Sequence, residues 1–392
     1  MQNKSPKAPE GRREHIQSLT ATVHAIALLW AKPPPLPWNG MSILKQYLKP
    51  LADDGAALTR EQARAVLEEI LAGNAQDAEI AGLVSILATR GEQAPELAGF
   101  VDVMRAHATP LPLSEAERGQ LVDVVGTGGG GPPTFNISSG AALVAAAAGA
   151  KVAKHGNRAV TSQCGSADVL EGLGVPITLG PEAAVDCLRE TGFMFLLAPN
   201  YHPAMKAVGA LRRALGFRTI FNLCGPLSNP AQAGAQVIGV LAASKALLVG
   251  RALLELGARR AFVVHGTDGM DELTTTGESV VARVEEGEKG ELKLRAARIS
   301  PEMAGLPLAT LDQLTGGDVA TNVSMLYDIF TGLAGPRRDI VLFNAAAGLV
   351  AAGLAADLKE GVQMGAEAID SGQAAATLEK LRRFAAKHVA KL

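Results

Sequence analysis

The chain has 392 residues, of which 48% are hydrophobic and 19% are charged, a composition that excludes general disorder. Its 37 Lys and Arg residues nearly balance its 39 Asp and Glu residues, so no overall basic field favours nucleic acid or an acidic membrane surface as a partner. Cys164, Cys187 and Cys224 have no metal-ligand spacing, so they predict neither a disulfide framework nor a zinc site and favour a cytoplasmic location.

Residues 1–40 combine a basic start, the apolar patch "ATVHAIALLWA" and the segment "KPPPLP". The patch is shorter than the roughly 20 apolar residues that a membrane span needs, and no clean small-residue cleavage site follows it. We therefore expect a disordered or over-long N-terminal extension, with Met41 as the natural start, rather than a signal peptide or a membrane anchor.

Residues 41–110 have a purely helical pattern. Thr59 and Gln62 predict a capping box at the start of "REQARAVLEEILAG", and two more amphipathic stretches follow before the pattern ends near His107. The segment "TPLPL" then reads as a linker. A further helical pattern at about 202–229 is expected to complete this small, discontinuous helical domain.

From Leu121 onward, the short apolar segments "LVDVVG", "AKVAK", "FMFLLA", "QVIGVLAA" and "RAFVVHG" alternate with helical patterns. Such alternation predicts a central, mostly parallel sheet covered by helices, here over residues 115–200 and 230–392. The predicted fold class is thus α/β, with a small helical N-terminal domain and a large α/β domain.

The segment "DVVGTGGGGPPTFNISSG" begins as a strand, passes through glycines 128–131 and enters a helix near Ser138. Glycines let backbone N–H groups approach an anion, and a helix N-terminus adds unsatisfied donors. The spacing matches neither the dinucleotide fingerprint nor a nucleoside-triphosphatase loop. It favours a phosphate or diphosphate cradle, with a flexible surface loop as the alternative.

The segment "KHGNRAVTSQCGSADVLEGLG" starts at Lys154, directly after a predicted strand, where open α/β sheets bind their ligands. Lys154 offers a point charge for a phosphate, and Asn157 offers directed hydrogen bonds. Ser162 and Ser166 resemble a second anion-binding nest at a helix start. The pattern leaves open whether His155 is structural or catalytic.

The turn "VVHGTDGMDELT" places Asp268, Asp271 and Glu272 directly after a buried strand. Neighbouring carboxylates repel one another, so a hard cation such as Mg²⁺ is their natural partner, and a solvated acidic turn is the alternative. Arg212, in "HPAMKAVGALRRALG", is a candidate for holding a substrate carboxylate, although such an arginine is more often paired or solvent-facing.

The motifs "GTGG", "TFNIS", "KHGNRAV", "GSADVLE", "HPAMK", "RTIFNLCGPLSNP", "HGTDGMDE" and "PRRDIVLFNAAAGLVAAG" occur in this order and at spacings that resemble those of the anthranilate phosphoribosyltransferase family. The resemblance covers about residue 41 to the C-terminus. It implies a fold of the nucleoside phosphorylase type and a homodimer formed through the helical domain. It also implies transfer of the 5-phosphoribosyl group of phosphoribosyl diphosphate to the amine of anthranilate, the second step of tryptophan synthesis from chorismate, with Mg²⁺ as cofactor.

The resemblance also implies the roles of individual residues. Those that would hold phosphoribosyl diphosphate are Gly126, Gly129, Gly130, Thr134, Asn136, Ser138, Ser139, Lys154, Ser162 and Ser166. Those that would bind anthranilate are Gly126, Asn157, His202 and Arg212, with His155 beside its path. The metal ligands would be Ser138, Asp271 and Glu272. Lys154 and His155 would act electrostatically, with no acid or base residue.

The implied chemistry agrees with this set of residues. Departure of diphosphate leaves an oxocarbenium-like ribosyl group, so the main need is to stabilise the leaving group's negative charge. The amine of anthranilate is already neutral and nucleophilic at pH 7, so no strong base is required. One position departs from the family pattern "GTGGD": Gly130 stands where the aspartate belongs, so we expect one principal metal site, at Asp271 and Glu272.

Two other functions are compatible with parts of the sequence. A pyrimidine nucleoside phosphorylase of the same fold would use phosphate and need no metal, and the acidic pair with Arg212 argues against it. A non-catalytic, nucleic-acid-binding relative would have a basic surface, which the net charge of -2 does not support.

Overall fold

The protein is described by a computed structural model that covers residues 43–128, 130–159, 162–287 and 290–389. The expected extension at 1–40 lies outside the described residues, and so does Gly129. The described chain opens with α2 (Ile43–Asp53), for which no separate helix was predicted within the helical region. It is followed by the three helices that the sequence predicts, α3 (Arg60–Leu71), α4 (Asp77–Arg90) and α5 (Ala94–Ala106).

Helix α3 starts with the predicted capping box. The backbone N–H of Gln62 donates to Thr59 Oγ1 (N···O 3.2 Å), and the backbone N–H of Thr59 donates to Gln62 Oε1 (2.9 Å). Its buried side chains follow helical spacing: Ala63, Val66, Leu67 and Ile70. This face packs on α5, where a Cβ on Gly99 would lie 2.4 Å from a backbone oxygen of α3. Glycine at that position therefore allows the close approach of the two helices.

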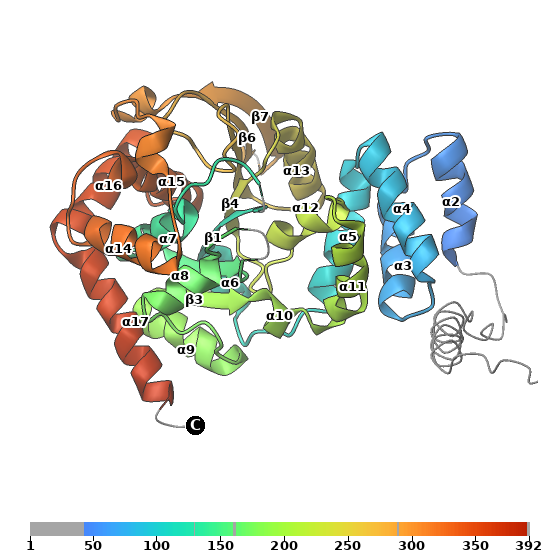
Figure 1. Cartoon of the computed structure of the whole chain (residues 1–392), viewed down its shortest axis with the longest axis horizontal. Helices are drawn as coiled ribbons and strands as arrows, with labels where there is room; N and C mark the ends of the chain where they lie inside the picture. Colours follow the sequence, from blue (N-terminus) through green and yellow to red (C-terminus); the bar gives the residue numbers. More distant parts are fainter. Residues whose placement is uncertain (1–42, 129, 160–161, 288–289, 390–392) are drawn as a thin grey trace, which may run out of the picture. The chain divides into compact units, whose positions relative to one another are not determined.

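The later helical segment returns to these helices. It contains α10 (Ala198–Tyr201), η1 (Pro203–Met205), α11 (Lys206–Leu215) and α12 (Ile220–Leu227). Helix α11 contacts α3 and α4, and α12 contacts α4 and α5. Figure 1 shows α12 beside α5. Val208, Phe221 and Cys224 are buried in the same hydrophobic cluster as the first helices.

The described residues form one seven-stranded sheet in the order β3-β2-β1-β4-β5-β6-β7. The five predicted strands are present as β1 (Leu121–Gly126), β2 (Lys151–Gly156), β3 (Phe193–Leu197), β4 (Ala235–Gly239) and β5 (Arg260–Gly266). All neighbouring pairs among these five strands are parallel. The fold class predicted from the sequence is confirmed.

Two further strands, β6 (Ser279–Glu286) and β7 (Leu292–Ile299), extend the sheet as an antiparallel hairpin. The apolar patterns of the sequence did not predict them. Strand β7 lies at the edge of the sheet and is mostly exposed, and its sequence "LKLRAARI" carries several charges. Charged residues are typical of edge strands because they oppose pairing with other chains, and they also hide the apolar strand pattern.

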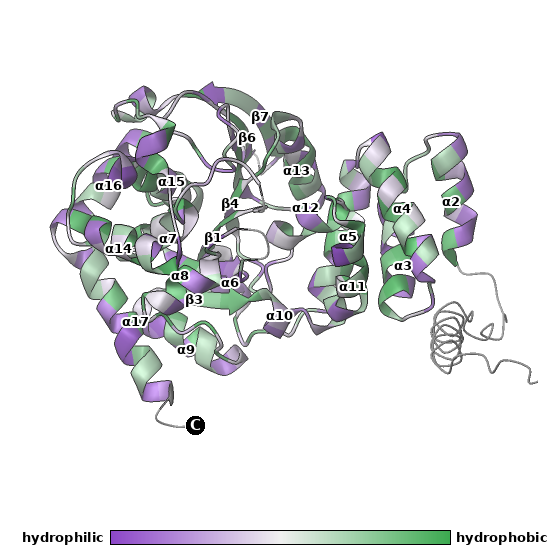
Figure 2. Ribbon diagram, viewed as in Figure 1, coloured by the Kyte–Doolittle hydropathy of each residue, from purple (hydrophilic) through white to green (hydrophobic). Residues whose placement is uncertain are grey.

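Helices cover both faces of the sheet, as expected for a parallel sheet. The helices of this domain are α6 (Glu115–Gln120), α7 (Ile137–Ala147), α8 (Ser166–Gly172), α9 (Pro181–Thr191), α13 (Ala243–Glu255), α14 (Val319–Phe330), α15 (Pro336–Ala352), α16 (Leu358–Asp370) and α17 (Gln373–Val389). Two short 3-10 turns, η2 (Pro301–Ala304) and η3 (Leu311–Leu314), lie between β7 and α14. Figure 2 shows hydrophobic residues along the central strands and mixed colours on the outer helices such as α17. No helix in the described ranges combines the length and apolarity needed to span a membrane.

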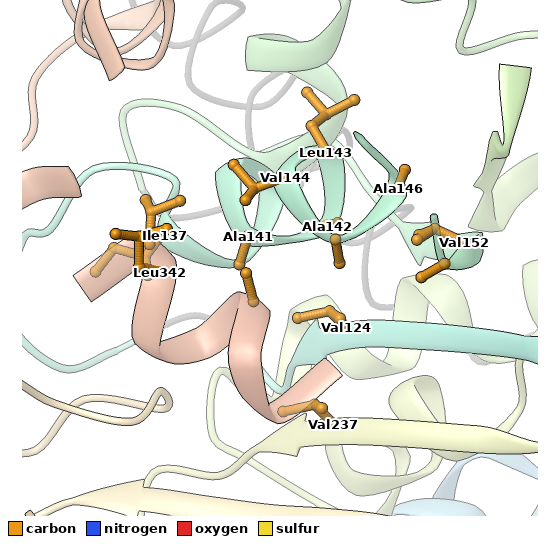
Figure 3. Packing of buried hydrophobic residues seen from close by; sticks show 14 of the residues in the cluster. Val124, Ile137, Ala141, Ala142, Leu143, Val144, Ala146, Val152, Val237 and Leu342 are labelled. Carbon is orange, nitrogen blue, oxygen red and sulfur yellow. The ribbon is translucent and has the colours of Figure 1, made fainter. Parts of the chain in front are cut away.

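The main core lies between α7, α15 and the sheet. Figure 3 shows Ala141 and Ala142 of α7 packed toward Val124 of β1, with Val237 of β4 beyond it. Small side chains let the helices approach closely: a Cβ on Gly140 of α7 would lie 2.7 Å from a side-chain atom of Leu326. The alanine-rich sequence of α7 thus serves both helix propensity and tight packing.

The strand order changes direction beside β1. The chain runs from β1 through β2 to β3 on one side, and then crosses to β4 on the other side of β1. In open parallel sheets, ligands bind outside the carboxyl ends of the strands at such a switch point. The glycine-rich segment follows β1 directly, so the fold places it at this point.

Candidate active site

The glycine-rich loop is fixed to the sheet and to Asp271. The backbone N–H of Thr127 donates to the carbonyl of Gly239 at the end of β4 (2.9 Å). The backbone N–H of Gly128, whose φ is +61°, donates to Asp271 Oδ2 (2.9 Å). A Cβ on Gly126 would lie only 2.4 Å from the same carboxylate oxygen, so only glycine fits there. The sequence-distant acidic turn therefore lies against the loop.

Asp271 and Glu272 are both partly accessible and poorly stabilised as anions. Desolvation raises the pKa of Asp271, and desolvation together with the charge of Asp271 raises the pKa of Glu272 well above its usual value. Asp268 differs from them, because it accepts hydrogen bonds from the hydroxyls of Thr274 (2.5 Å) and Thr276 (2.6 Å). Asp268 therefore fixes the turn, whereas Asp271 contacts the loop and, with the adjacent Glu272, forms a pair that a cation would stabilise.

Lys154 completes the charged part of the site. It is 1% exposed, and its Nζ donates to the carbonyl of Val124 (2.5 Å) and to Ser138 Oγ (3.4 Å). Burial lowers the pKa of Lys154 to about 8, while the charges of Asp123, Glu272 and Asp271 act in the opposite direction. The lysine thus connects Ser138, at the start of α7, with the acidic pair after β5.

The residues present fit a magnesium ion that is shared with a substrate. Within the described ranges, no group of three His, Cys, Asp or Glu side chains is placed to hold a metal by itself. Asp271, Glu272 and the Ser138 hydroxyl supply few protein ligands, and Mg²⁺ commonly takes its remaining ligands from water and substrate phosphates. Desolvation raises the pKa of both carboxylates, so a bound cation would stabilise their charged forms.

The predicted second nest lies after β2. Ser166 Oγ donates to the carbonyl of Asn157 (3.2 Å), and a Cβ on Gly156 would lie 2.4 Å from the same hydroxyl. Ser162 is exposed, and its Oγ donates to the carbonyl of Cys164 (3.5 Å). Asn157 is exposed beside them. The structure thus brings Asn157 and Ser166 together at the end of β2.

Three other predicted residues lie in or just before the first turn of α7. Asn136 donates through Nδ2 to the carbonyl of Cys164 (3.2 Å) and accepts through Oδ1 from Asn322 (2.9 Å). Ser139 is completely buried, and its hydroxyl has no hydrogen-bond partner among the described residues. Thr134 forms an isolated bridge with Thr315. Asn136 is therefore held by hydrogen bonds within the protein, whereas the buried hydroxyl of Ser139 has no such bond among the described residues.

His155 and His202 form a buried pair, with exposed fractions of 5% and 6% and ring centroids 5.1 Å apart. Because a carbonyl can only accept, the contact between His155 Nδ1 and the Gly225 carbonyl (3.2 Å) places the proton on Nδ1 and a lone pair on Nε2. Neither Nε2 atom has a hydrogen-bond partner in the described part of the chain. Burial lowers the pKa of His155 to about 3 and also lowers the pKa of His202.

We expect the buried His155 to make the protein less stable as the pH falls. Its pKa is about 3 in the folded chain, whereas the unfolded chain binds the proton near the usual histidine value of about 6.5. Below about pH 6.5 the unfolded state therefore binds more protons, which lowers the free energy of unfolding by about 2 kcal/mol at pH 5.

Urea unfolding of the wild type and of His155→Asn at pH 8 and pH 5 measures this effect. At pH 8 the imidazole is neutral in both states, so that comparison is the control for lost packing. At pH 5 the variant should gain about 2 kcal/mol relative to the wild type. The same difference between the two proteins at both pH values would contradict the assignment.

Arg212, on α11, packs against α12. Its guanidinium carbon is 5.6 Å from the ring centroid of Phe221, and no ion pair joins it to a carboxylate of the described residues. Burial lowers the pKa of Arg212. Cys224, which is close enough to influence this pKa, precedes the Gly225 carbonyl that contacts His155. A partly buried cation without a carboxylate is suited to binding an anionic group of a ligand.

Sequence patterns missed Asp123, Asn229 and Arg218. Asp123 is completely buried and accepts hydrogen bonds from Asn229 Nδ2 (2.7 Å) and from the backbone N–H of His155 (3.3 Å). Burial raises the pKa of Asp123 to about 7, and the charge of Lys154 opposes this change. A charged residue inside the apolar strand "LVDVVG" was the available signal. Arg218 donates through Nη2 to the carbonyl of Gly128 (2.8 Å), which no local pattern predicts.

Comparison with known proteins agrees with this arrangement. Residues 118–375 match the family described as "Glycosyl transferase family, a/b domain", and residues 45–108 match its "helical bundle domain". The anthranilate phosphoribosyltransferase of Chloroflexus aurantiacus is 49% identical over 330 residues, which cover 84% of this chain and 94% of the relative. That of Roseiflexus castenholzii is 50% identical over 328 residues, which cover 83% of this chain and 94% of the relative.

Solved structures show the same likeness. The crystal structure of the Thermus thermophilus enzyme has a TM-score of 0.79 at 41% identity, covering 88% of this chain and 99% of that one. The Saccharomyces cerevisiae enzyme in complex with PRPP and Mg has a TM-score of 0.78 at 26% identity, covering 89% and 99%. With curated relatives this similar over most of its length, the chain belongs to the anthranilate phosphoribosyltransferase family.

Proposed function

We propose that this chain transfers the 5-phosphoribosyl group of phosphoribosyl diphosphate to the amine of anthranilate and releases diphosphate. The observation that carries the proposal is the convergence of the glycine-rich loop, the buried Lys154 and the pair Asp271 and Glu272 at the carboxyl ends of β1, β2 and β5. The names of the curated relatives support it. A solved relative from Saccharomyces cerevisiae binds PRPP and Mg, which supports the same substrate and metal here.

Stabilisation of the leaving diphosphate is the main chemical task of the site. Asp271, Glu272 and Ser138 would hold Mg²⁺, which when bound neutralises negative charge on the leaving group. Lys154 adds a cation from the end of β2, and backbone N–H groups of the loop donate to phosphate oxygens. Because these groups are fixed before the substrate arrives, little reorganisation is needed as charge develops.

The acceptor side of the site requires positioning rather than proton removal. Arg212 would bind the carboxylate of anthranilate, and Asn157, with Gly126, would help to place the ring. The Nε2 lone pair of His155 can accept a hydrogen bond from the amine, and His202 lies beside it. With a pKa of about 3, His155 is too weak a base to hold a proton at neutral pH. Placing the amine next to the anomeric carbon supplies the remaining rate enhancement.

A fluorescence assay that follows anthranilate tests the proposed function. With phosphoribosyl diphosphate and Mg²⁺, anthranilate fluorescence should fall in proportion to the diphosphate released. Omission of Mg²⁺ should stop the reaction, which separates this activity from a metal-independent nucleoside phosphorylase. If anthranilate is not consumed while a pyrimidine nucleoside is cleaved by phosphate, the proposal is wrong.

We expect Arg212→Ala to raise the KM for anthranilate by about tenfold or more, because a charge-assisted hydrogen bond to the carboxylate is lost. The bond is about equally strong in the ground state and in the transition state, so kcat should change less. Initial rates at varied concentrations of each substrate measure both constants. A rise confined to the KM for phosphoribosyl diphosphate would assign this helix to the other substrate.

We also propose that the protein is a cytoplasmic homodimer that associates through its helical domain, comprising residues 41–110 and about 202–229. The α/β domain, residues 115–200 and 230–392, would carry the phosphoribosyl diphosphate site. The family resemblance supports this arrangement. Light scattering of the purified chain should give twice the mass of 40.5 kDa, and a monomer mass at all concentrations would contradict it.

A further inference from the structure

A guanidinium lies beside the one loop position where this chain departs from the family pattern. A Cβ built on Gly130 would lie 2.9 Å from Arg218 Nη2 and 3.5 Å from a side-chain carbon of Leu241. The backbone of Gly130 is not in the left-handed region, so glycine is not required there for conformational reasons. A side chain at position 130 would therefore point at Arg218.

Arg218 and Asp271 both bind the backbone of Gly128. Arg218 Nη2 donates to the carbonyl of Gly128, while the N–H of Gly128 donates to Asp271 Oδ2. Desolvation lowers the pKa of Arg218, and the nearby charge of Asp271 acts in the opposite direction. The guanidinium, the acidic pair and the loop thus meet in one region, although Arg218 comes from the segment between α11 and α12.

We infer that Arg218 binds the diphosphate of the substrate in this chain, and that Gly130 keeps this contact strong because it supplies no carboxylate to compete for the guanidinium. The inference rests on the proposed function, since it concerns the leaving group of that reaction. A planar guanidinium matches the oxygens of a phosphate in a way that a lysine ammonium does not. A carboxylate at position 130 would pair with Arg218 and repel the diphosphate.

Calorimetric titration of inorganic diphosphate into the full chain, with EDTA present, tests the contact without metal, anthranilate or turnover. Arg218→Gln should weaken binding by about tenfold or more, because a charge-assisted hydrogen bond is lost. Arg251→Gln removes the same charge from an exposed position on α13 and should leave the dissociation constant within about twofold, as expected for a surface charge. Arg218→Lys should retain part of the affinity.

A second pair of variants separates charge from loop structure. Gly130→Asp and Gly130→Asn add side chains of the same size, and only the first adds a carboxylate. Gly130→Asp should weaken diphosphate binding about tenfold more than Gly130→Asn does, which a purely structural role of Arg218 would not produce. Melting temperatures show whether each variant folds. If Arg218→Gln does not fold, the comparison of Gly130→Asp with Gly130→Asn tests the inference by itself.

The outcomes distinguish this inference from the proposed function. Equal affinities of Arg218→Gln and Arg251→Gln, equal affinities of the two Gly130 variants, or no diphosphate binding by the wild type would overturn the inference. If the wild type consumes anthranilate and Arg218→Gln still binds diphosphate normally, the function stands and the inference falls. If diphosphate binding depends on Arg218 and anthranilate is never consumed, the inference stands and the function falls.

Discussion

We expect Asp271→Asn and Glu272→Gln each to lower turnover by about a hundredfold or more, because each removes a charged ligand of the proposed metal, a contribution of several kcal/mol to the transition state. The fold should tolerate both changes. The amide oxygen of an asparagine at position 271 can still accept the hydrogen bond from Gly128, and its volume suits the close contact with Gly126. Both replacements also relieve the repulsion that raises the pKa of Glu272.

Initial rates over a range of Mg²⁺ concentrations, together with melting temperatures, measure these effects. Glu278→Gln is the matched control, since it removes a carboxylate from an exposed ion pair with Arg298 and should leave the rate unchanged. Asp268→Asn should lower the melting temperature instead, because it disturbs the bonds from Thr274 and Thr276. If Asp271→Asn and Glu272→Gln both reach the wild-type rate at saturating Mg²⁺, the acidic pair has no role in the mechanism.

The fold could be predicted wherever local patterns are strong. The capping box at Thr59 and the apolar segments of β1 to β5 are local signals that the structure confirms. The hairpin of β6 and β7 was missed, because one of its strands is an exposed edge with many charges. Its place in the sheet depends on pairing with β5, which is a tertiary contact that no local window contains.

Part of the site could be predicted for the same reason. Lys154 was expected just after a strand and lies instead inside β2, near its carboxyl end, while Asp271 lies in the turn that follows β5. The carboxyl ends of parallel strands meet at one edge, so their proximity follows from topology. Arg218 and Asn229 follow no strand and reach the site from the segment around α12. Sequence spacing cannot show that a guanidinium from there contacts Gly128, or that Asn229 contacts Asp123.

We expect Asp123→Asn to raise the KM for phosphoribosyl diphosphate strongly and to lower the free energy of unfolding by about 3 kcal/mol or more, the usual cost of breaking a buried charge pair. The carboxylate supports the charge of Lys154 at a position where burial already lowers the pKa of the lysine to about 8. Without it, Lys154 loses a counter-charge and holds its proton less firmly.

The hydrogen bonds of Asp123 explain why the isosteric amide cannot replace it. Asn229 Nδ2 and the backbone N–H of His155 both donate to this side chain, so an asparagine must place its own NH₂ group against one of two donors. A buried donor left without an acceptor costs about 1–3 kcal/mol, and the end of β2, which carries Lys154, loses a fixed contact.

Urea unfolding and steady-state kinetics separate the two consequences. Asp186→Asn, an exposed residue of α9, is the control for removing one negative charge and should change neither quantity. Because Lys154 is proposed to bind the phosphates, the KM for phosphoribosyl diphosphate should rise more than the KM for anthranilate. A variant that is destabilised yet keeps both KM values would show that Asp123 supports only the sheet. If the stability and both KM values are unchanged, the Asp123–Lys154 pair makes no net contribution to either. The cost of burying the two charges would then equal the free energy of their attraction.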